Sequence, residues 1–298
     1  MSRALRSIRY GAVMTGPHPA VAVVTDSTAY LPPDMVGNLT VVPLAVVVNG
    51  VAGLDTVDID AATVADALNA RRVAVTTSRP SPETFSQVYR ELLDGGAEAV
   101  LSVHLSAQLS GTYDAAVLAA APFDGRVEVI DAQSTGMGLG FPAVAAASTA
   151  AAGGSLAEVR EAALAAVGRT TTLFYVDTLE FLRRGGRIGA AAALLGTALS
   201  VKPILHTTEQ GVVVREKVRT ASRALARLVD IAAESAGSSE VDVAVHHLAA
   251  PDRADALLTT LKERLGAQLR GAYLTEVGAV VGAHVGPGMV AVVVYRTA

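Results

Sequence analysis

The first half of the chain alternates short β-branched runs with stretches of helical periodicity. Each run is followed by turn residues, and then usually by a helical pattern. Strands that alternate with helices are typical of βαβ units, in which the strands are parallel and helices cover the sheet. We therefore predict an α/β fold whose amino-terminal domain is a three-layer α/β/α structure with a mostly parallel sheet. The predicted strands are 21–25, 40–48, 73–76, 99–104 and 127–131.

The second half has a different order of elements, and it predicts a carboxyl-terminal α/β domain with a mixed sheet. Two β-branched runs separated by Thr-Thr-Glu-Gln-Gly indicate a hairpin, and an apolar helix from Ile188 precedes it. The boundary is predicted at residues 168–172, which gives domains 20–168 and 169–298; residues 1–19 are expected to be a mobile tail or an overextended start. The strands are 173–176, 201–205, 212–218, 241–246, 272–276 and 289–295, and the amphipathic helices are 221–233 and 252–265.

Composition narrows the function classes. Hydrophobic residues make up 51% of the chain and charged residues 17%, so disorder is excluded for most of its length. The absence of cysteine removes disulfides, thiol nucleophiles and thiolate metal sites. A net charge of −4 without a basic block argues against a nucleic-acid partner. No run reaches the ~18–20 apolar residues that span a bilayer, so we expect no membrane span and a cytoplasmic protein.

Three motifs suggest cofactor or metal chemistry, but each lacks a necessary residue. Gly136-Met-Gly-Leu-Gly140 has Phe141 where the dinucleotide fingerprint requires its third glycine. Asp55, Asp58 and Asp60 lack the glycine and the glutamate of a calcium loop, and Asp60 is expected to cap a helix. His246-His247 has no third ligand. We therefore expect no metal, no cofactor and no catalytic residues.

Two hydroxyl-bearing turns lie at predicted strand ends. Thr77 and Ser78 precede a capped helix, and Ser110-Gly111-Thr112 starts another helix, whose free N–H groups favour an anion. Such positions border the ligand crevice of open α/β sheets, so the two turns can hold a carboxylate. The alternative is that Thr77 shapes a turn and Ser110 caps a helix, as these residue types often do. Local sequence alone favours this alternative.

Four segments, taken together and in this order, resemble the DegV family. They are Val24-Thr-Asp-Ser-Thr-Ala-Tyr-Leu-Pro32, Thr77-Ser-Arg-Pro-Ser81, Leu109-Ser-Gly-Thr-Tyr113 and His284-Val-Gly-Pro-Gly288. The family consists of two-domain α/β proteins that hold a long-chain fatty acid in a closed pocket. The resemblance extends over the chain after residue 20.

The resemblance implies a set of site residues. Thr77 and Ser110 would hold the fatty-acid carboxylate, with His284 and Arg219 near the head group and Arg219 also at a partner surface. Asp26, Ser27, Ser78, Gly111 and Thr112 would be supporting loop positions. The run Leu179-Glu-Phe-Leu-Arg-Arg-Gly-Gly-Arg-Ile188 matches another family signature and opens the apolar helix. The candidates for the acyl pocket, placed inside the second domain, are Ile188, Leu194, Leu195 and Leu199.

The resemblance also implies a function. The chain would bind a long-chain fatty acid such as palmitate and present it to a separate fatty acid kinase, which forms an acyl phosphate for phospholipid synthesis. The chain itself would be a carrier subunit without independent activity. The alternative from another class is a phosphotransferase or hydrolase that acts on a small phosphorylated ligand in the interdomain cleft. The sequence offers no nucleotide-binding loop for that alternative.

Overall fold

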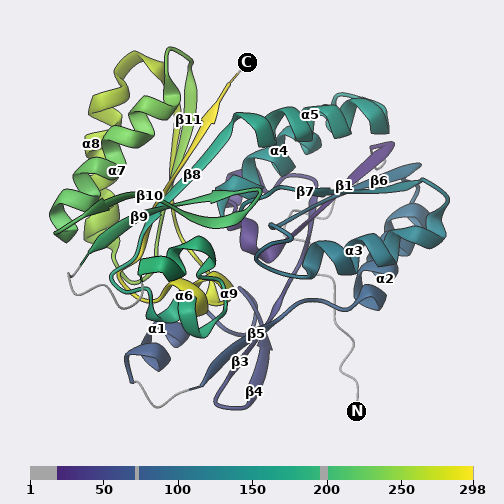
Figure 1. The fold of residues 1–298 in the computed structure, drawn as a ribbon. Helices are drawn as coiled ribbons and strands as arrows, with labels where there is room; N and C mark the ends of the chain where they lie inside the picture. Colours follow the sequence, from purple (N-terminus) through teal and green to yellow (C-terminus); the bar gives the residue numbers. More distant parts are fainter. Residues whose placement is uncertain (1–18, 71–73, 195–200, 298) are drawn as a thin grey trace.

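The strands form three sheets in the computed structural model, which describes residues 19–70, 74–194 and 201–297. Figure 1 shows a parallel sheet on the right, a mixed sheet on the left, and a small antiparallel sheet below and between them. The α/β class and the combination of a parallel and a mixed sheet are as predicted. None of the described helices combines the length and the apolar character that a bilayer-spanning helix needs.

The parallel sheet lies between two layers of helices. Its order is β2 (Leu39–Val42), β1 (Val21–Asp26), β6 (Ala99–His104) and β7 (Val127–Asp131). The helices α2 (Pro82–Asp94) and α3 (Thr112–Ala120) cover one face, and α4 (Met137–Ala151) and α5 (Leu156–Arg169) cover the other. Alternate residues of β1 enter the two cores, with Val23 on the α4 side and Val24 on the α2 side. The predicted three-layer arrangement is therefore confirmed.

The predicted strand at 40–48 is wrong, because the chain leaves the parallel sheet at Pro43. Proline lacks the N–H that a ladder requires, and the chain breaks there into β2 and β3 (Ala45–Val48). The small antiparallel sheet consists of β4 (Val51–Leu54), β3 and β5 (Val75–Ser78). The predicted strand at 73–76 thus belongs to this sheet and not to a parallel βαβ unit, and Val73 lies outside the described residues. Helix α1 (Ala61–Asn69) begins after Asp60, whose carboxylate caps it as predicted.

The mixed sheet carries the second half of the chain. Its order is β10 (Gly211–Val218), β9 (Lys202–Thr208), β8 (Thr170–Tyr175), β13 (Val290–Arg296), β11 (Val241–His247) and β12 (Leu269–Glu276). The predicted hairpin is confirmed as the antiparallel pair β9 and β10. Helices α7 (Ala221–Ala236) and α8 (Pro251–Leu265) pack on one face of this sheet. Residues of the other face, such as Phe174, contact a separate apolar cluster toward the small sheet.

Two short helices complete the region between the sheets. Helix α6 (Glu180–Arg184) packs beside α9 (Ala279–Val285), and α9 also contacts α1, β3 and β5 of the small-sheet region. The apolar helix predicted from Ile188 is, over its described part, a 3-10 helix (Gly189–Leu194). Gly189 has a positive φ of 53° and lies against the backbone of Val212, so the chain turns here instead of starting an α-helix. Leu195 and Leu199 lie outside the described residues.

Candidate functional site

A pocket lies between the mixed sheet, α9 and the loop that follows β6. The space between its lining atoms is about 920 Å³ when the open solvent at its mouth is included. Most of its wall is apolar and comes from residues far apart in the chain, including Leu44, Leu105, Leu109, Phe174, Val212 and Met289. The pocket is therefore formed jointly by segments from both halves of the sequence.

Thr77 and His284 meet at the polar part of the wall. Thr77 is in β5 and His284 in α9, and Thr77 Oγ1 lies 2.8 Å from His284 Nε2. Burial, and to a lesser extent the charge of Arg187, lowers the pKa of His284 to about 4. The imidazole is therefore neutral near pH 7. When Nε2 carries its proton, it donates to Thr77, and the Thr77 hydroxyl is then free to donate to a ligand in the pocket.

Gly185 lies directly against the other side of the His284 ring. A Cβ on Gly185 would collide with His284 Nδ1, which is buried and has no hydrogen-bond partner among the described residues. The glycine in the Arg-Arg-Gly-Gly-Arg run thus allows the backbone to approach the imidazole closely. This contact holds the ring in place, with Nε2 toward Thr77.

Ser110 lies in the same pocket, at the start of α3. Its hydroxyl is 2.9 Å from Thr112 Oγ1, and it also accepts from Thr112 N at 3.3 Å. The guanidinium of Arg79 donates to Gly111 O, at 3.3 Å, and so connects this turn to the segment that follows Thr77 and Ser78. Ser78 and Arg79 also line the pocket. The two hydroxyl-bearing turns predicted from the sequence are thus brought to one cavity.

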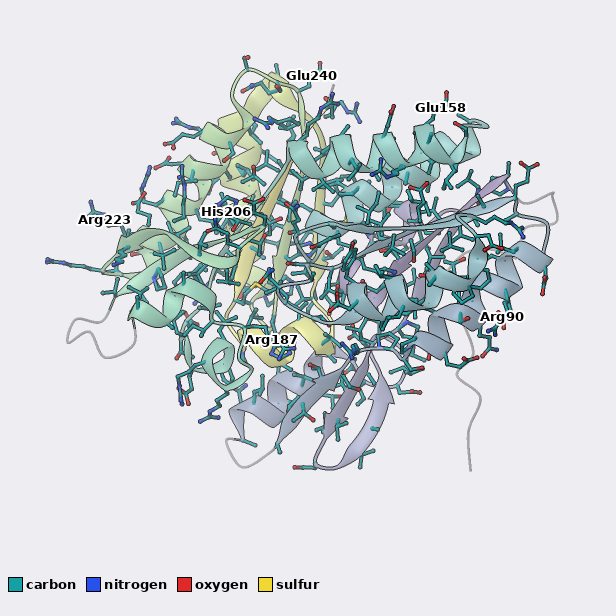
Figure 2. All side chains as sticks on the ribbon, turned by 45° about the vertical axis from the view of Figure 1, so that its right-hand side comes forward. Arg90, Glu158, Arg187, His206, Arg223 and Glu240 are labelled. Carbon is teal, nitrogen blue, oxygen red and sulfur yellow. The ribbon has the colours of Figure 1, made fainter. Side chains whose placement is uncertain are left out.

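Arg187 is a pocket residue that the sequence did not identify. Its Nε donates to Leu109 O at 2.8 Å and its Nη1 to Gly185 O at 2.6 Å, so the side chain spans the two segments. Figure 2 shows it beside α9, toward the middle of the molecule. Arg183 and Arg184 form ion pairs with Glu180 instead. Of the three arginines in this run, only the third, Arg187, lines the pocket, and Arg79 lines it from another segment.

The remaining predicted residues lie elsewhere. Arg219 is an exposed residue directly after β10 and does not line the pocket. Ile188 is half-buried and packs against the apolar cluster that includes Leu182 and Val212, but it is not part of the pocket wall. Leu194 is buried and is likewise absent from the wall. The mixed sheet and α9 contribute a substantial part of the observed wall, which helical periodicity could not reveal.

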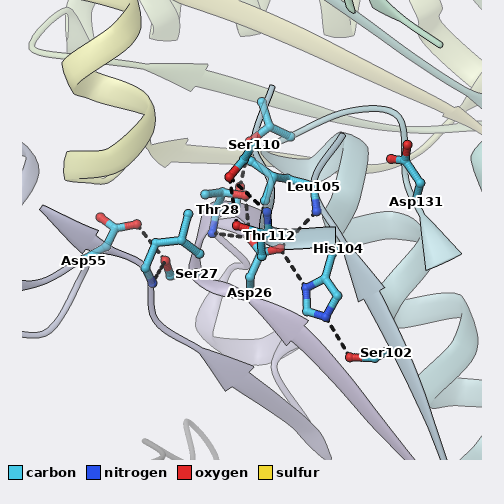
Figure 3. Close-up of polar contacts among 12 residues, drawn as sticks. Asp26, Ser27, Thr28, Asp55, Ser102, His104, Leu105, Ser110, Thr112 and Asp131 are labelled. Atoms are coloured by element: carbon cyan, nitrogen blue, oxygen red, sulfur yellow. Dashed lines mark hydrogen bonds and ion pairs between the residues drawn. The ribbon is translucent and has the colours of Figure 1, made fainter. Parts of the chain in front are cut away.

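Asp26 and Ser27 hold pocket-lining backbone in place without lining the pocket themselves. Asp26 Oδ2 accepts from Leu105 N at 3.0 Å, and Ser27 Oγ accepts from Leu44 N at 3.1 Å (Figure 3). Ser27 also donates to the carboxylate of Asp55 at 2.8 Å. These hydrogen bonds fix the backbone positions of two apolar wall residues, Leu44 and Leu105.

Asp55 anchors the helix that carries His284. Its carboxylate accepts from Val280 N and from the Tyr30 hydroxyl, both at 3.2 Å, at the start of α9. Burial raises the pKa of Asp55 to about 6, and the hydrogen bonds from Ser27, Val280 and Tyr30 limit the rise. Asp55 therefore connects the small sheet and α9 through a buried carboxyl group that is ionised near pH 7.

A serine, a histidine and an aspartate are also connected in the order found in hydrolase triads. Ser102 Oγ lies 2.7 Å from His104 Nε2, and His104 Nδ1 donates to Asp26 Oδ2 at 3.0 Å (Figure 3). All three side chains are fully buried, and Tyr89 donates to Ser102 from the core. None of them lines the pocket, so no substrate can reach this serine. The three side chains form a buried hydrogen-bonded group between β1 and β6 of the parallel sheet. This group gives no support to a hydrolase.

The glycine-rich segment at residue 136 is used for packing. Gly136 has a positive φ of 62° and lies against His246, whose Nε2 accepts from Met137 N at 2.8 Å. The N-terminal end of α4 thus faces a neutral histidine, whose pKa is lowered to about 4 by burial. Within the described ranges, no group of three or more histidine or carboxylate side chains is arranged to hold a metal ion.

Comparison with known proteins identifies the family. The family model described as "Uncharacterised protein, DegV family" matches residues 20–297. The chain belongs to the DegV family. A DegV domain-containing protein of Streptomyces coelicolor is 52% identical over 276 residues, which cover 92% of this chain and 98% of the relative.

Solved structures of DegV proteins have the same fold. A DegV family protein from Thermus thermophilus, described for its fatty acid binding, matches with a TM-score of 0.87 and 35% identity, and covers 93% of this chain and 99% of its own. DegV from Bacillus subtilis, described as a fatty acid binding protein, matches with a TM-score of 0.83 and 29% identity, and also covers 93% of this chain and 99% of its own. These matches agree with the two kinds of sheet described above.

Proposed function

We propose that this chain binds one long-chain fatty acid, with the acyl tail in the apolar pocket and the carboxylate at Thr77 and Ser110. The observation that carries the proposal is that Thr77, Ser110 and His284 line one pocket whose wall is largely apolar. A ligand that suits this wall has a long apolar part and one polar end. The fatty-acid ligands of the related Thermus and Bacillus proteins support the same class.

The head group would be held by hydroxyl groups and by the guanidinium of Arg187. Thr77 and Ser110 each supply an O–H donor, and Arg187 keeps N–H groups beyond the two that Leu109 and Gly185 use. Hydrogen bonds to a charged carboxylate are roughly twice as strong as neutral ones. His284 acts through Thr77: as a neutral Nε2–H donor, it leaves the threonine proton for the ligand. Asp26, Ser27, Gly111 and Thr112 support this set through the contacts described above.

The apolar tail would supply most of the affinity. Burial of a methylene contributes about 0.8 kcal/mol, so a chain of about 16 carbons contributes roughly 10–12 kcal/mol before costs. Immobilising a flexible chain and ordering the binding partners costs several kcal/mol. We therefore expect nanomolar to micromolar affinity, which is tight enough for the ligand to survive purification.

The proposal includes a partner enzyme. A carboxylate held near the mouth of a pocket can leave one oxygen open to a kinase, which would form the acyl phosphate by in-line attack on its own ATP. The carrier then needs no catalytic residue of its own and would act in the cytoplasm. Arg219 is exposed after β10 and so is available to a partner protein. The family resemblance supports this step, and phospholipid synthesis would use the product.

Mass spectrometry of the organic extract of the purified protein tests this function. We expect a C14–C18 acid in near one-to-one ratio with the chain. A double variant, Thr77→Val with Ser110→Ala, is expected to carry much less of it, while Thr76→Val, on the exposed face of the same strand, keeps the full amount. A stoichiometric phosphorylated metabolite in place of the acid would favour the phosphotransferase or hydrolase alternative.

A further inference from the structure

A second set of hydroxyl groups faces the pocket, apart from the head-group residues. Thr172 of β8 and Thr207 of β9 both line the pocket, and both side chains are buried. Leu173 pairs with His206 across these antiparallel strands, so the two threonines lie side by side at the next position, on the sheet face that carries Phe174. Both contact Ser134, which follows β7. Within the described chain, no hydrogen bond connects this set to Thr77, Ser110 or His284.

The protons of these three hydroxyl groups can be counted. Ser134 donates to Thr172 Oγ1 at 2.9 Å, and the carbonyl of Thr135 is a more distant acceptor of the same proton at 3.5 Å. A hydroxyl has one proton, so in the 3.1 Å contact between Ser134 and Thr207 the donor is Thr207. The Thr172 proton then has no acceptor among the described residues, and Thr207 keeps its lone pairs unused. One donor and one acceptor are thus left side by side at the pocket wall.

Thr172 and Thr207 both face the pocket, which can supply the partner that the described residues do not. Gly138 of α4 closes the opposite side of the cluster, where a Cβ would collide with Ser134 Oγ and Thr172 Oγ1. Next to Thr172 along β8 is the apolar wall, with Phe174 in register with Ala291 of β13. A valine at position 172 would have nearly the shape of threonine without the cost of a buried unpaired hydroxyl. A pocket shaped only for a plain acyl chain has no use for this donor.

We propose that the pocket takes a fatty acid whose chain carries a hydroxyl group, which accepts from Thr172 and donates to Thr207. A ligand hydroxyl supplies the one donor and the acceptor lone pairs that the two threonines leave unpaired. This inference rests on the proposed function, because it assigns a second polar contact to the same ligand. It extends the ligand class from unsubstituted long-chain acids to long-chain acids with a hydroxyl group on the chain. An ordered water bound to the threonines is the other occupant, and it would not distinguish hydroxylated from plain acids.

The test compares palmitic acid with a positional series of monohydroxypalmitic acids on the full-length, delipidated chain. Dissociation constants are measured by calorimetry for the wild type, Thr172→Val, Thr207→Val, Ser134→Ala and Thr171→Val. Ser134→Ala frees the proton that Thr207 donates to Ser134, so it tests the hydrogen-bond assignment. Thr171→Val is the matched control, because Thr171 is on the opposite face of β8 and does not line the pocket. Melting temperatures of all variants establish that each is folded.

We expect at least one hydroxylated isomer to bind the wild type about three- to tenfold more tightly than palmitic acid, as one or two neutral hydrogen bonds allow. The preference should disappear in Thr172→Val, shrink in Thr207→Val and persist in Thr171→Val, which changes the opposite face of β8. Equal binding of palmitic acid and every isomer to the wild type would overturn the inference while leaving the proposed function intact, as would an unchanged preference in Thr172→Val. If no acid of the series binds the wild type, the proposed function fails as well.

Discussion

Thr77 Oγ1 and His284 Nε2 lie 2.8 Å apart, although 207 residues separate them in the chain. The contact connects the last strand of the small antiparallel sheet with α9, and Asp55 anchors the start of that helix. His284 is neutral near pH 7. With its one ring proton on Nε2, it donates to Thr77 and leaves the threonine hydroxyl to donate into the pocket. The proposed carboxylate site therefore depends on how the small sheet packs against α9.

Removal of the two hydroxyl groups is expected to weaken fatty-acid binding without unfolding the protein. Thr77→Val and Ser110→Ala should each lose about 1–3 kcal/mol of binding free energy, the range for a hydrogen bond to a charged group. Calorimetric titration with palmitate measures the loss, and thermal melts check the fold. Thr76→Val is the control, because Thr76 is exposed on the other side of β5. Wild-type affinity in both variants would mean that the carboxylate binds elsewhere.

Arg187 and Arg219 are expected to act at different steps. Arg187 lines the pocket, so Arg187→Met should weaken fatty-acid binding about ten- to a hundredfold by loss of a charge-assisted contact. Arg219 is exposed and absent from the wall, so Arg219→Ala should leave binding intact and lower acyl phosphate formation by an added fatty acid kinase. Binding and kinase assays on both variants separate the steps. Equal losses in both assays for Arg219→Ala would assign it to the lipid site instead.

His284 is expected to make stability fall in mild acid. Its folded-state pKa of about 4 is below the unfolded value of 6.5, so its contribution is present above pH 6.5 and is lost as the pH falls toward 4. Between pH 7 and pH 5 this loss is about 2 kcal/mol. Urea unfolding at the two pH values should show a smaller acid-induced loss, by about that amount, in His284→Gln. His246 and Asp55 titrate in both proteins, so their effects cancel in the comparison.

The pocket wall predicts which substitution changes the preferred acyl length. Ala291 lies in the wall, in register with Phe174 on one side and His246 on the other. Ala291→Leu should shorten the longest acid bound, because the added methylenes extend into the cavity. Leu194→Phe is the matched control: it overpacks a buried position outside the wall and should cost about 1–3 kcal/mol of stability without any change in length. A shorter bound acid in Leu194→Phe would instead support the sequence-based prediction that this residue faces the acyl chain.

Much of the fold could be predicted because its information is local. Alternating runs identified most of the parallel strands, and Asp60 caps its helix as predicted. The break at Pro43 was missed, although a proline within a predicted strand is a local signal of its end. The pairing of β5 with β3 was also missed, because it depends on non-local contacts.

The pocket wall was harder to predict than its polar residues. Thr77, Ser110 and His284 stand in recognisable motifs, but Phe174 and Val212 are ordinary strand residues with no local mark of a ligand. The apolar run after Ile188 indicated burial correctly for Leu194. Periodicity does not reveal whether a buried side chain is covered by protein or by ligand. Arg187 could have been predicted as a pocket residue. Unlike Arg183 and Arg184, it lies too far along the chain from Glu180 to form a helical ion pair with it.

The most direct test of the central claim is a crystal structure of the chain with palmitate bound. We predict the carboxylate within hydrogen-bond distance of both Thr77 Oγ1 and Ser110 Oγ, with Arg187 beside it and the acyl chain against Phe174, Val212 and Ala291. A carboxylate at Thr172 and Thr207, with the tail toward Thr77, would contradict the proposed orientation. A palmitate bound outside this pocket would contradict the account as a whole.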